Sequence, residues 1–555
     1  MNATQQLHSY IAARLTAATV TRADLWALQY RYMGEPFPGR FTFKYHPWTK
    51  EMLCSDAEEN AGQKAAQMGF TDSVGINRAF YVIDQKKQDV LYVLPAKTPD
   101  ATDFSSGRFD PALERSEYLR SLFTNVNNVG LKRAGTNSLY VRGSRSRSAM
   151  KSLPVGLIVL DESDEFDEEA VVLVRERISG QREGARQLWH LSTPSIPNHG
   201  VNIPFTLSDQ RHFFFKCPSC SKLIELTYPE SIVVTADDPN DLKINESHYI
   251  CTECKKPLPS EIKDGVDWAK VDYLNASGQW VATYPDRFIR GYTIPQMYSC
   301  LISASRFAKA SLLALTSPAE EQEFYNSKIG TTHIVEGASV NDEHLDACIS
   351  DYRMRDPKLM SAQVITMGVD VGKKLHCEII GWTINRKNSV DVNEEAEGKV
   401  IFATTVKEFT DVDNLIYTFR PACTVIDDMP DTRSALALAR RHKGRVKLCH
   451  YGTSTYRDIS DYGERITVDR TSWLDLSLGR FIKGNIRLPL DIPKEYRDQV
   501  KALIRVPEKD KHGNPYYVYR KTNEDHYGHA RNYAEIALKC AHFGTNTRPM
   551  SERTR

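Results

Sequence analysis

Two acidic side chains lie directly after a predicted buried strand, which would place them at the edge of a sheet. Asp161 and Glu162 directly follow the apolar run Leu157–Leu160. In that position the first carboxylate can hold the water shell of a Mg²⁺ ion, and the second can orient or deprotonate an attacking water. The pair therefore indicates a site that hydrolyses a nucleotide. The alternative interpretation is that both acids only solvate the end of the strand.

A phosphate-binding loop would have to accompany this pair, and the usual pattern G-x-x-x-x-G-K-[ST] is absent. Residues 64–71 read KAAQMGFT, in which Gly69 and Thr71 keep their usual places. Lys64 replaces the first glycine, and Phe70 replaces the usual lysine. Because lysine is a point charge on a flexible stem, Lys64 can reach a phosphate from the opposite end of the loop. Thr71 would then supply a hydroxyl to Mg²⁺.

The segments around this loop give mixed indications. Backbone N–H groups that lead into a helix predicted at 72–83 would hold the phosphates. Residues 55–63 are polar and predict a poor strand, so a helix surface is the alternative interpretation of the loop.

Ser192 and Thr193 follow a third short strand and would report the loss of the γ-phosphate to a moving subdomain. Their alternative role is a simple turn before Pro194.

Four of the 11 cysteines form two Cys-x-x-Cys pairs within residues 212–260. Two such knuckles provide the thiolates of a closed tetrahedral site, which is typical of structural Zn²⁺ and leaves no position open for catalysis. The other cysteines are scattered, which favours a reducing compartment over a disulfide framework. The predicted zinc ligands are Cys217, Cys220, Cys251 and Cys254, and loss of the metal through a displaced knuckle is the alternative.

A second group of acids lies in the C-terminal part of the chain. One acid sits in a strand bordered by glycines, an acidic pair ends a second strand, and a further acid opens the last helix. Buried carboxylates are costly unless paired or metal-bound, so three that converge can hold two Mg²⁺ or Mn²⁺ ions for attack on a phosphodiester. These acids are Asp370, Asp427 with Asp428, and Asp525, while His526 and His529 either add ligands or cap the helix.

Strands alternate with helices in the first half of the chain, which predicts a parallel sheet covered on both faces. In the first half, strands are predicted at 89–95, 157–160 and 188–191, with a helix at 168–178. A second αβ pattern begins near residue 360, with two hairpin-like strands at 364–371 and 378–383, a third strand at 422–426, and helices at 434–442 and 523–540.

The composition excludes several classes of protein. A hydrophobic content of 41% and an aromatic content of 10% exclude a largely disordered chain. No run reaches the roughly 18 apolar residues of a membrane span, and residues 1–30 do not read as a signal peptide. The 72 Lys and Arg against 71 Asp and Glu argue against a uniformly basic surface. The basic runs 142–151 and 433–447 leave room for a local DNA path, and a solvated helix face is their alternative.

Together these residues resemble the large terminase subunit of tailed bacteriophages, in particular the lambda-type family. The resemblance covers nearly the whole chain from about residue 40. Its most specific element is the loop at 64–71, in which the lysine leads and an aromatic side chain precedes the hydroxyl. The other similar segments are Leu157–Glu162, Leu191–Pro194, the two cysteine pairs, Phe324–Gly330 and Gly368–Gly372.

The resemblance implies an α/β protein with an N-terminal P-loop ATPase domain of the ASCE type, a zinc-ribbon-like insert and a C-terminal RNase H-like nuclease domain. Glu162 would be the catalytic base of the ATPase, and Ser192 and Thr193 its coupling motif. ATP and Mg²⁺ would be bound by Lys64, Gln67, Gly69, Thr71 and Asp161, together with the coupling motif.

In the nuclease, the resemblance implies that Asp370 is the first acid and that Asp427 or Asp428 is the second. Asp525 would be the third. Family members often carry a further acid four residues later, where this chain has His529. The divalent ions of this site would therefore be held by Asp370, Asp428, Asp525 and His529.

The resemblance also sets expectations for domains and partners. We expect a helical arm at 1–38 that docks a small terminase subunit, an ATPase domain at 39–355, a nuclease domain at 356–542 and a flexible tail at 543–555. The expected partners are double-stranded viral DNA, the small subunit, the portal of the procapsid and further copies in a ring, in the host cytoplasm and without a membrane. Arg175 and Arg177 are candidates for the trans-acting arginine finger.

Two other functions remain open from the sequence. The unusual loop at 64–71 is compatible with a metal-dependent DNA nuclease of prophage origin whose ATP site is degenerate. The cysteine pairs and basic runs are compatible with a zinc-stabilised DNA-binding scaffold that has neither activity.

Overall fold

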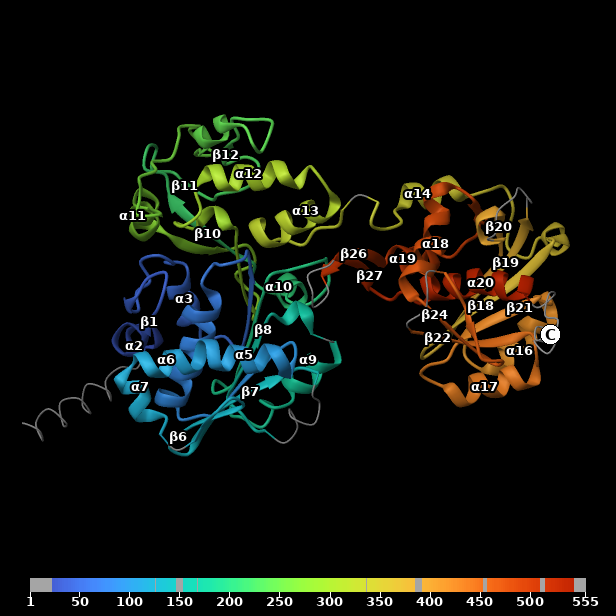
Figure 1. Cartoon of the computed structure of the whole chain (residues 1–555), viewed down its shortest axis with the longest axis horizontal. Coiled ribbons are helices and arrows are strands. Elements are labelled where there is room, and N and C mark those ends of the chain that lie inside the picture. The colour runs from blue at the N-terminus through green and yellow to red at the C-terminus, as the bar shows by residue number, and fades with distance from the viewer. Residues whose placement is uncertain are drawn as a thin grey trace, which may run out of the picture. The chain divides into compact units, whose positions relative to one another are not determined.

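A computed structural model describes residues 22–124, 126–145, 153–166, 168–335, 337–384, 392–452, 457–509 and 515–543. By its internal contacts the chain divides into two units, Met1–Val335 and Glu336–Arg555 (Figure 1). The first unit is built on a sheet of 11 strands and the second on a sheet of 8 strands. Among the described residues, no helix has both the length and the apolar character that crossing a membrane requires.

The sheet of the first unit is parallel through its centre, as the alternation of strands and helices predicts. Only β9 separates β3 from β8, so the carboxyl ends of these three strands meet at one edge. The spatial order is β11 (Leu223–Ile224), β10 (Arg211–Lys216), β17 (Arg290–Ile294), β3 (Glu59–Lys64), β9 (Gln187–Ser192), β8 (Leu157–Asp161), β4 (Val90–Leu94), β7 (Asn137–Gly143), β6 (Leu131–Ala134) and β5 (Val126–Asn128), with β16 (Gln279–Ala282) paired to β10.

Strand β3 corrects the expectation that the polar residues before the loop form a poor strand. It is a central strand, and its polar side chains are buried with partners. Ser55 Oγ donates to Asn60 Oδ1 at 2.6 Å, and Gln63 Nε2 donates to the Gly330 carbonyl at 3.1 Å. Asn202 Nδ2 donates to Gln63 Oε1 at 3.0 Å. Buried polar groups that are hydrogen-bonded in this way carry little penalty, so a polar sequence can occupy the centre of the sheet.

The N-terminal helix α2 (Ala23–Tyr30) is part of the core of the first unit. Trp26 is fully buried, and its indole N–H donates to Asp84 Oδ2 at 2.8 Å. The described part of the predicted arm therefore packs against the helix that follows the loop, while residues 1–21 lie outside the described residues. That helix comprises η1 (Thr71–Ile76), α4 (Asn77–Tyr81) and η2 (Val82–Lys86).

Further helices of the first unit cover its sheet, lie close to the loop or pack against the cysteine-rich insert. They are α3 (Thr49–Leu53), α6 (Asp110–Arg115), α7 (Glu117–Leu122), α9 (Glu168–Arg175), α10 (Asn202–Leu207), α11 (Trp268–Ser277), α12 (Ala304–Ala314), α13 (Pro318–Glu323) and η8 (Phe324–Ile329). The short strands β12 (Ile232–Val233) and β13 (His248–Tyr249) pair within the cysteine-rich insert.

The sheet of the second unit places the predicted acid-bearing strands side by side. Strand β18 (Val364–Val371) lies between β19 (Leu375–Ile384), which is antiparallel to it, and β21 (Cys423–Asp427), which is parallel. The spatial order is β23 (Ser460–Asp461), β24 (Arg465–Val468), β22 (Val446–Tyr451), β21, β18, β19, β20 (Ala396–Val406) and β25 (Ile486–Arg487), while β26 (Leu503–Lys509) and β27 (Pro515–Lys521) form a separate hairpin.

Helices cover both faces of this second sheet. Met367 and Val369 pack in one hydrophobic cluster with residues of α16 (Phe409–Phe419) and α17 (Thr432–Arg441). Successive side chains of a strand point to opposite faces, so Gly368 and Asp370 face the other side. There α20 (His526–Phe543) lies directly on β18, where Thr366 Oγ1 donates to the Ala534 carbonyl at 2.8 Å. The result is a three-layer α/β/α unit with Asp370 beneath the start of α20.

The boundary between the units falls about twenty residues before the predicted position at 355/356. Helix α14 (Asp342–Cys348) explains this difference, because Leu345 and Cys348 are buried in the core of the second unit. Lys501 of α19 (Lys494–Lys501) also pairs with Asp342 at 2.9 Å. The same core includes residues of α18 (Arg470–Lys483).

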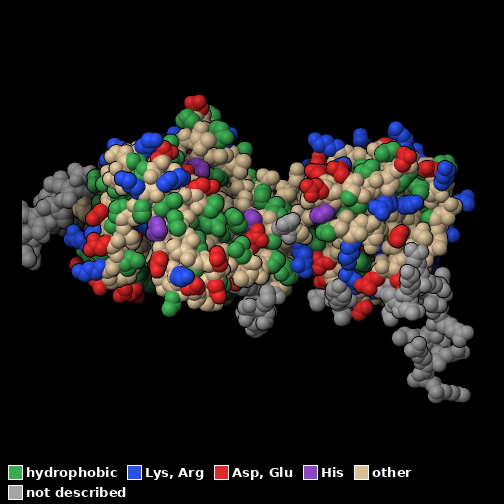
Figure 2. Space-filling model, turned by 90° about the horizontal axis from the view of Figure 1, so that it is seen from above, with side chains coloured by type: hydrophobic (Ala, Val, Ile, Leu, Met, Phe, Trp, Pro, Cys, Tyr) green, Lys and Arg blue, Asp and Glu red, His purple; other side chains and the backbone are tan. Residues whose placement is uncertain are grey.

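Positive and negative side chains are nearly equal in number in this chain. On the face shown in Figure 2, Lys and Arg side chains are interspersed with Asp and Glu. Within the basic run 433–447, Arg441 pairs with Asp413 at 2.7 Å and Lys447 pairs with Asp461 at 2.7 Å. Part of this run is therefore already neutralised within its own unit.

Candidate active sites and metal centre

The loop at 64–71 follows the carboxyl end of β3, and its residues allow the backbone conformation that it adopts. Gln67 and Gly69 both have positive φ, of 62° and 79°. A Cβ on Gly69 would lie 2.9 Å from the ring of His46, so glycine is required there for space as well as for backbone conformation. Phe70, in the place of the usual lysine, is 1% exposed and packs against Gly62. A buried aromatic ring cannot bind a phosphate, so Lys64 is the lysine of this loop that can do so.

Two backbone N–H groups at the start of the loop are already engaged. The N–H of Ala65 donates to the Ile294 carbonyl at 3.1 Å, and that of Ala66 donates to the Ser327 carbonyl at 2.8 Å. On the other side, Trp48 Nε1 donates to the Met68 carbonyl at 2.9 Å. The loop is therefore anchored from both sides before any ligand binds.

Lys64 lies beside the acidic pair. Its Nζ is 3.6 Å from Glu162 Oε1, and its side chain is 7% exposed against 48% for Glu162. Glu162 has a positive φ of 57°, and its N–H donates to the Leu191 carbonyl at 2.8 Å. This conformation turns the Glu162 carboxylate out of the strand and toward the loop.

Asp161 is buried at the centre of the same edge. It accepts from Tyr92 Oη at 2.5 Å and from Thr71 Oγ1 at 3.3 Å. Burial, and then the neighbouring Glu162 carboxylate, raise the pKa of Asp161 above its ordinary value. The structure thus brings together Thr71 and Asp161, the two side chains predicted to share a Mg²⁺ ion. Sequence reasoning missed Tyr92, although it lies in the predicted strand 89–95.

A chain of hydrogen bonds leads away from this edge through the predicted coupling residues. The N–H of Asp164 donates to Ser192 Oγ at 3.2 Å, and the Asp164 carboxylate accepts from the Ser195 N–H at 2.8 Å. The Ser195 carbonyl accepts from Asn326 Nδ2 at 2.7 Å and from the His333 N–H at 3.2 Å. Segment 322–333 therefore touches both the turn after β9 and, through Ser327, the phosphate-loop candidate.

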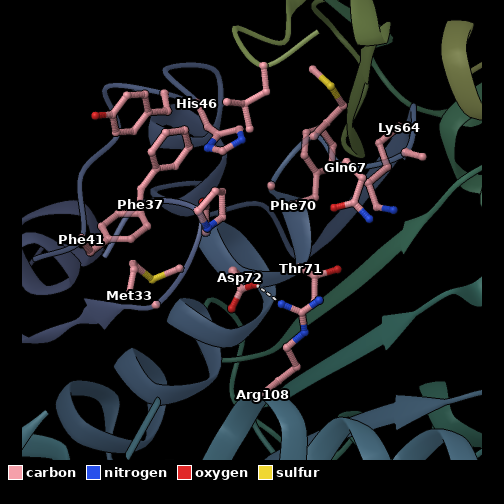
Figure 3. A pocket seen from close by; sticks show the side chains of 18 of the residues that line it. Met33, Phe37, Phe41, His46, Lys64, Gln67, Phe70, Thr71, Asp72 and Arg108 are labelled. Carbon is pink, nitrogen blue, oxygen red and sulfur yellow. Dashed lines mark hydrogen bonds and ion pairs between the residues drawn. The ribbon is translucent and has the colours of Figure 1, made fainter. Parts of the chain in front are cut away.

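A cavity of about 440 Å³ opens beside the loop (Figure 3). Lys64, Gln67 and Thr71 lie on one side of it, and an aromatic segment that includes Phe37 and His46 lies on the other. Burial lowers the pKa of His46 to about 4, so its imidazole is uncharged near neutral pH. The cavity therefore has a polar, loop-lined side and an apolar, aromatic side.

The two candidates for an arginine finger lie away from this cavity. Arg175 pairs with Glu59 at 2.6 Å, at the start of β3. The Arg177 carbonyl accepts from the N–H of Val155, just before β8. Both therefore lie at the amino ends of the strands, opposite the edge that carries Glu162.

The four cysteines of the insert converge as predicted for a metal site. Their sulfur atoms all lie within 4.8 Å of one another. Cys217 Sγ is 4.0 Å from Cys254 Sγ, and Cys220 Sγ is 3.9 Å from Cys251 Sγ. Four thiolates at about 2.3 Å from a tetrahedral Zn²⁺ would be about 3.8 Å apart, whereas a disulfide needs about 2.05 Å. The donor set and its spacing fit Zn²⁺.

In the second unit, Asp370 and Asp427 lie on adjacent strands and face the same side of the sheet. In the parallel pairing of β18 and β21, Val369 lies opposite Ile426, which brings the two following acids together. Burial and the charge of Asp370 raise the pKa of Asp427 to about 6. The charge of Asp370 adds to the burial effect, so the two carboxylates are close enough to repel each other.

Asp428 has a different environment from Asp427. Its Oδ1 lies 3.4 Å from Arg465 Nη2, on β24 beyond the neighbouring strand. The geometry therefore favours Asp427, and not the predicted Asp428, as the acid that accompanies Asp370. The reason is the alternation of side chains, which sends consecutive residues at a strand end in opposite directions.

Asp525 and two histidines stand at the start of α20, where His526 contacts Asp370. Asp525 Oδ2 lies 3.2 Å from His529 Nε2, and His529 Nδ1 lies 3.1 Å from Tyr451 Oη. His526 Nδ1 lies 2.8 Å from Asp370 Oδ2. His376, which sequence reasoning missed, lies opposite Asp370 in the β18–β19 hairpin. The short turn between these strands was the signal that could have identified it.

Two family models match the chain. The ATPase domain of the phage terminase large subunit gpA matches residues 36–280, and the endonuclease domain of the terminase large subunit gpA matches residues 289–472. The matched residues include the loop at 64–71, the four cysteines, Asp370 and Asp427. Asp525, His526 and His529 lie beyond them.

Several solved structures are similar to the chain. The HK97 bacteriophage large terminase is 11% identical, with coverage of 93% of this chain and 99% of that chain and a TM-score of 0.48. A large terminase from a thermophilic bacteriophage, in complex with ADP, is 11% identical, covers 87% and 94%, and has a TM-score of 0.30. The large terminase nuclease of the thermophilic phage G20c is 13% identical, covers 34% and 94%, and has a TM-score of 0.22. No curated protein sequence matches the chain.

Proposed function

Because the chain belongs to the gpA family of phage terminase large subunits, with an ATPase domain and an endonuclease domain, we propose that one set of its residues drives DNA packaging and that a second set cuts the DNA. The ATPase would act through the edge formed by β3, β8 and β9. The nuclease would act through the acids beneath α20. One chain would thus carry two separate catalytic centres.

In the ATPase centre, we assign phosphate binding to Lys64 and to the backbone N–H groups from Gln67 to Thr71. Thr71 and Asp161 would hold a divalent ion, preferably Mg²⁺, which would neutralise negative charge on the phosphates. Glu162 would orient and deprotonate the attacking water. The apolar side of the cavity, with Phe37 and His46, suits a nucleotide base, and its loop-lined side suits the phosphates.

Coupling to movement would start at Ser192 and Thr193. Ser192 accepts a hydrogen bond from the backbone of Asp164, which follows the acidic pair by two residues. Asp164 in turn holds Ser195, whose carbonyl is bound by Asn326 and His333. A shift of the acidic pair on loss of the γ-phosphate would therefore be passed to segment 322–333, which precedes the boundary between the units.

In the nuclease centre, we assign the binding of divalent ions to Asp370, Asp427 and Asp525, with His529 held against Asp525. Two such ions supply an activated water and stabilise the leaving oxygen. The carboxylates would place both ions at the edge of β18 and β21. Mg²⁺ and Mn²⁺ both accept such oxygen ligands.

The four cysteines would hold a structural Zn²⁺ that fixes the insert to the core of the ATPase unit. Cys217 and Cys251 are buried within that core, together with Phe215 and Tyr249. Loss of the metal would leave buried thiols in contact with apolar side chains. The metal would therefore contribute to folding and not to catalysis.

The proposed partners follow from the family. They are double-stranded viral DNA, a small terminase subunit, the portal of the procapsid and other copies of the chain in a ring, in the host cytoplasm. Docking of the small subunit on the arm at 1–38 stays a proposal, and we assign the ATPase to the unit that ends at Val335 and the nuclease to the unit that begins at Glu336.

The observation that carries the ATPase proposal is the meeting of Lys64, Thr71 and the acidic pair at one sheet edge. We expect Lys64→Ala to weaken binding of a fluorescent ATP analogue and to abolish DNA-stimulated ATP hydrolysis. Lys50→Ala, on the exposed side of α3, is the matched control and should keep both. ATP hydrolysis at the wild-type rate in Lys64→Ala would favour the alternative in which the chain is a nuclease with a degenerate ATP site.

A further inference from the structure

Sequence reasoning also missed Arg108, which faces the proposed ATP site. Arg108 belongs to the helical turn η4 (Ser105–Phe109), which comes after β4. Its side chain lines the cavity beside the loop at 64–71, and Figure 3 shows its guanidinium next to Thr71 and Asp72. The side chain is 55% exposed, and its Nη1 lies 3.2 Å from Asp72 Oδ2. Arg108 therefore lies at the start of the helix that follows the loop, where backbone N–H groups would bind phosphates.

The turn that carries Arg108 is fixed to the core of the site. Phe109, the next residue, is fully buried, and its ring packs edge-on against Tyr92 with centroids 5.2 Å apart. Phe104, just before the turn, stacks on the same Tyr92 ring at 5.1 Å. The Tyr92 hydroxyl in turn donates to Asp161. The backbone position of Arg108 is therefore set by the same tyrosine that binds the proposed Mg²⁺ ligand.

Arg108 also lines a second cavity, of about 530 Å³. The two cavities share Arg108 and Glu162, together with Leu94 and Phe104. Glu162 is the proposed base, so the attacking water and the γ-phosphate would meet beside it. An arginine that lines both cavities is thus near the reacting end of the nucleotide, and not at the aromatic side of the site.

Asp72 would keep a second cation if Arg108 left it. The buried guanidinium of Arg31 is 1% exposed and has its Nη2 4.0 Å from Asp72 Oδ1. Arg31 Nε donates to Asn77 Oδ1 at 2.5 Å, which holds the guanidinium in place. Burial lowers the pKa of Arg31 to about 10, so this side chain remains charged near neutral pH. Because exposed ion pairs contribute little stability, the contact between Arg108 and Asp72 can be exchanged with little loss.

We propose that Arg108 exchanges Asp72 for the γ-phosphate when ATP binds, and that it does so within the same chain as the loop. The proposal rests on the assignment of the ATP site to residues 64–71. Lys64, at the start of the loop, is its only lysine, and the place of the usual lysine near the end holds a buried ring. Arg108 would supply the positive charge that a lysine at that end usually brings to the phosphates.

A guanidinium suits this role chemically. Its planar fork can donate two parallel hydrogen bonds to phosphate oxygens. A positive group in contact with the transferring phosphoryl group also stabilises the negative charge of the transition state. Arg108 would therefore bind ATP in preference to ADP and would increase the rate of hydrolysis.

The alternative is a structural ion pair that only ties η4 to the helix after the loop. In that case, loss of Arg108 would lower Tm and would weaken binding of ADP and ATP alike. Contact with the γ-phosphate predicts a loss for the triphosphate alone. The ratio of the two affinities, and not the activity, therefore separates the two roles.

The test measures binding of fluorescent ADP and of a fluorescent, non-hydrolysable ATP analogue to the full-length protein. We expect Arg108→Ala to weaken binding of the ATP analogue by at least about tenfold, because a hydrogen bond between charged groups is lost, and to change ADP binding by less than about twofold. Arg120→Ala, an exposed arginine on α7, is the matched control and should bind both nucleotides as the wild type does. An unchanged ratio of the two affinities in Arg108→Ala would overturn the proposal.

A double-mutant cycle tests the exchange itself. Asp72→Asn frees Arg108, so it should tighten binding of the ATP analogue when Arg108 is present. The same substitution should gain less in the Arg108→Ala background. Equal gains in both backgrounds would mean that Asp72 acts through its own charge alone, and would refute the exchange.

Lys64→Ala separates this proposal from its premise. This variant should lose binding of the ATP analogue, and wild-type binding in it would refute the assignment of the ATP site to the loop. Lost binding in Lys64→Ala together with a wild-type affinity ratio in Arg108→Ala would refute the role of Arg108 and leave the site assignment intact.

Discussion

The contact between β18 and α20 predicts a severe effect for Gly368→Ala. An added Cβ would overlap the Ala530 carbonyl oxygen and the Ala534 N–H, and would lie 2.9 Å from the Tyr533 carbonyl carbon. All three obstacles are backbone atoms, so no side-chain rotation can make room. Helix α20 would have to retreat from the strand by on the order of 1 Å to restore ordinary contact distances.

The size of this effect can be worked out from the retreat of the helix. Overpacking typically costs about 1–3 kcal/mol, and a fixed backbone on both sides places Gly368→Ala at the upper end of that range. For a unit of this size, roughly 3 kcal/mol lowers Tm by about 6–12 °C. The retreat would also carry Asp525 and His526 away from Asp370. Since a misplacement of about 1 Å can cost 100-fold in rate, metal-dependent nicking should fall by about that factor.

The assay pairs thermal melting with nicking of supercoiled plasmid in Mn²⁺. Gly479→Ala in α18 is the matched control, because no atom lies within 4 Å of its added Cβ. Alanine favours a helix interior over glycine by about 1 kcal/mol, so this control should be neutral or slightly stabilised. A Gly368→Ala protein with unchanged Tm and normal nicking would refute the close packing of α20 on β18 and the geometry derived from it.

Three further predictions concern other parts of the chain. Glu162→Gln should keep ATP binding and lower the rate of ATP hydrolysis by at least about 100-fold, and an unchanged rate would remove Glu162 from the role of base. Cys217→Ser, or a strong chelator, should release one Zn²⁺ per chain and lower the Tm of the ATPase unit, whereas wild-type protein without zinc in elemental analysis would contradict the site. Burial raises the pKa of Glu378 to about 7, above its ordinary value of 4.5. The folded protein therefore keeps a proton that the unfolded chain loses, so stability should fall by roughly 3 kcal/mol as the pH rises from 4.5 to 7. Glu378→Gln should flatten this slope in melting curves recorded across that range.

The proposed ATPase site shows which features the sequence could predict and which it could not. The positions of Lys64, Thr71 and Glu162 could be predicted because each stands at a fixed distance from the end of an apolar run or within a loop pattern. The central strand before the loop could not, because the partner that buries Gln63 is the carbonyl of Gly330, far along the chain. Burial by tertiary contacts leaves no periodic signal in the strand itself.

The nuclease site shows the same limit in the choice of ligands. The sequence offered Asp370, Asp427, Asp428 and Asp525 as candidate ligands, but it could not separate Asp427 from Asp428 without the direction of β21. The place of His376 beside Asp370 was missed because it comes from a hairpin register, and His526 stacks on it from a helix about 150 residues later. Strand registers and helix docking, and not residue types, decide these assignments.

The central claim is that one chain holds two independent catalytic centres, one at Glu162 and one at Asp370. The most direct test measures DNA-stimulated ATP hydrolysis and Mn²⁺-dependent DNA cleavage side by side in Glu162→Gln and Asp370→Asn. We predict that Glu162→Gln loses hydrolysis and keeps cleavage, and that Asp370→Asn loses cleavage and keeps hydrolysis. Loss of both activities in either folded variant, or retention of both, would contradict the account.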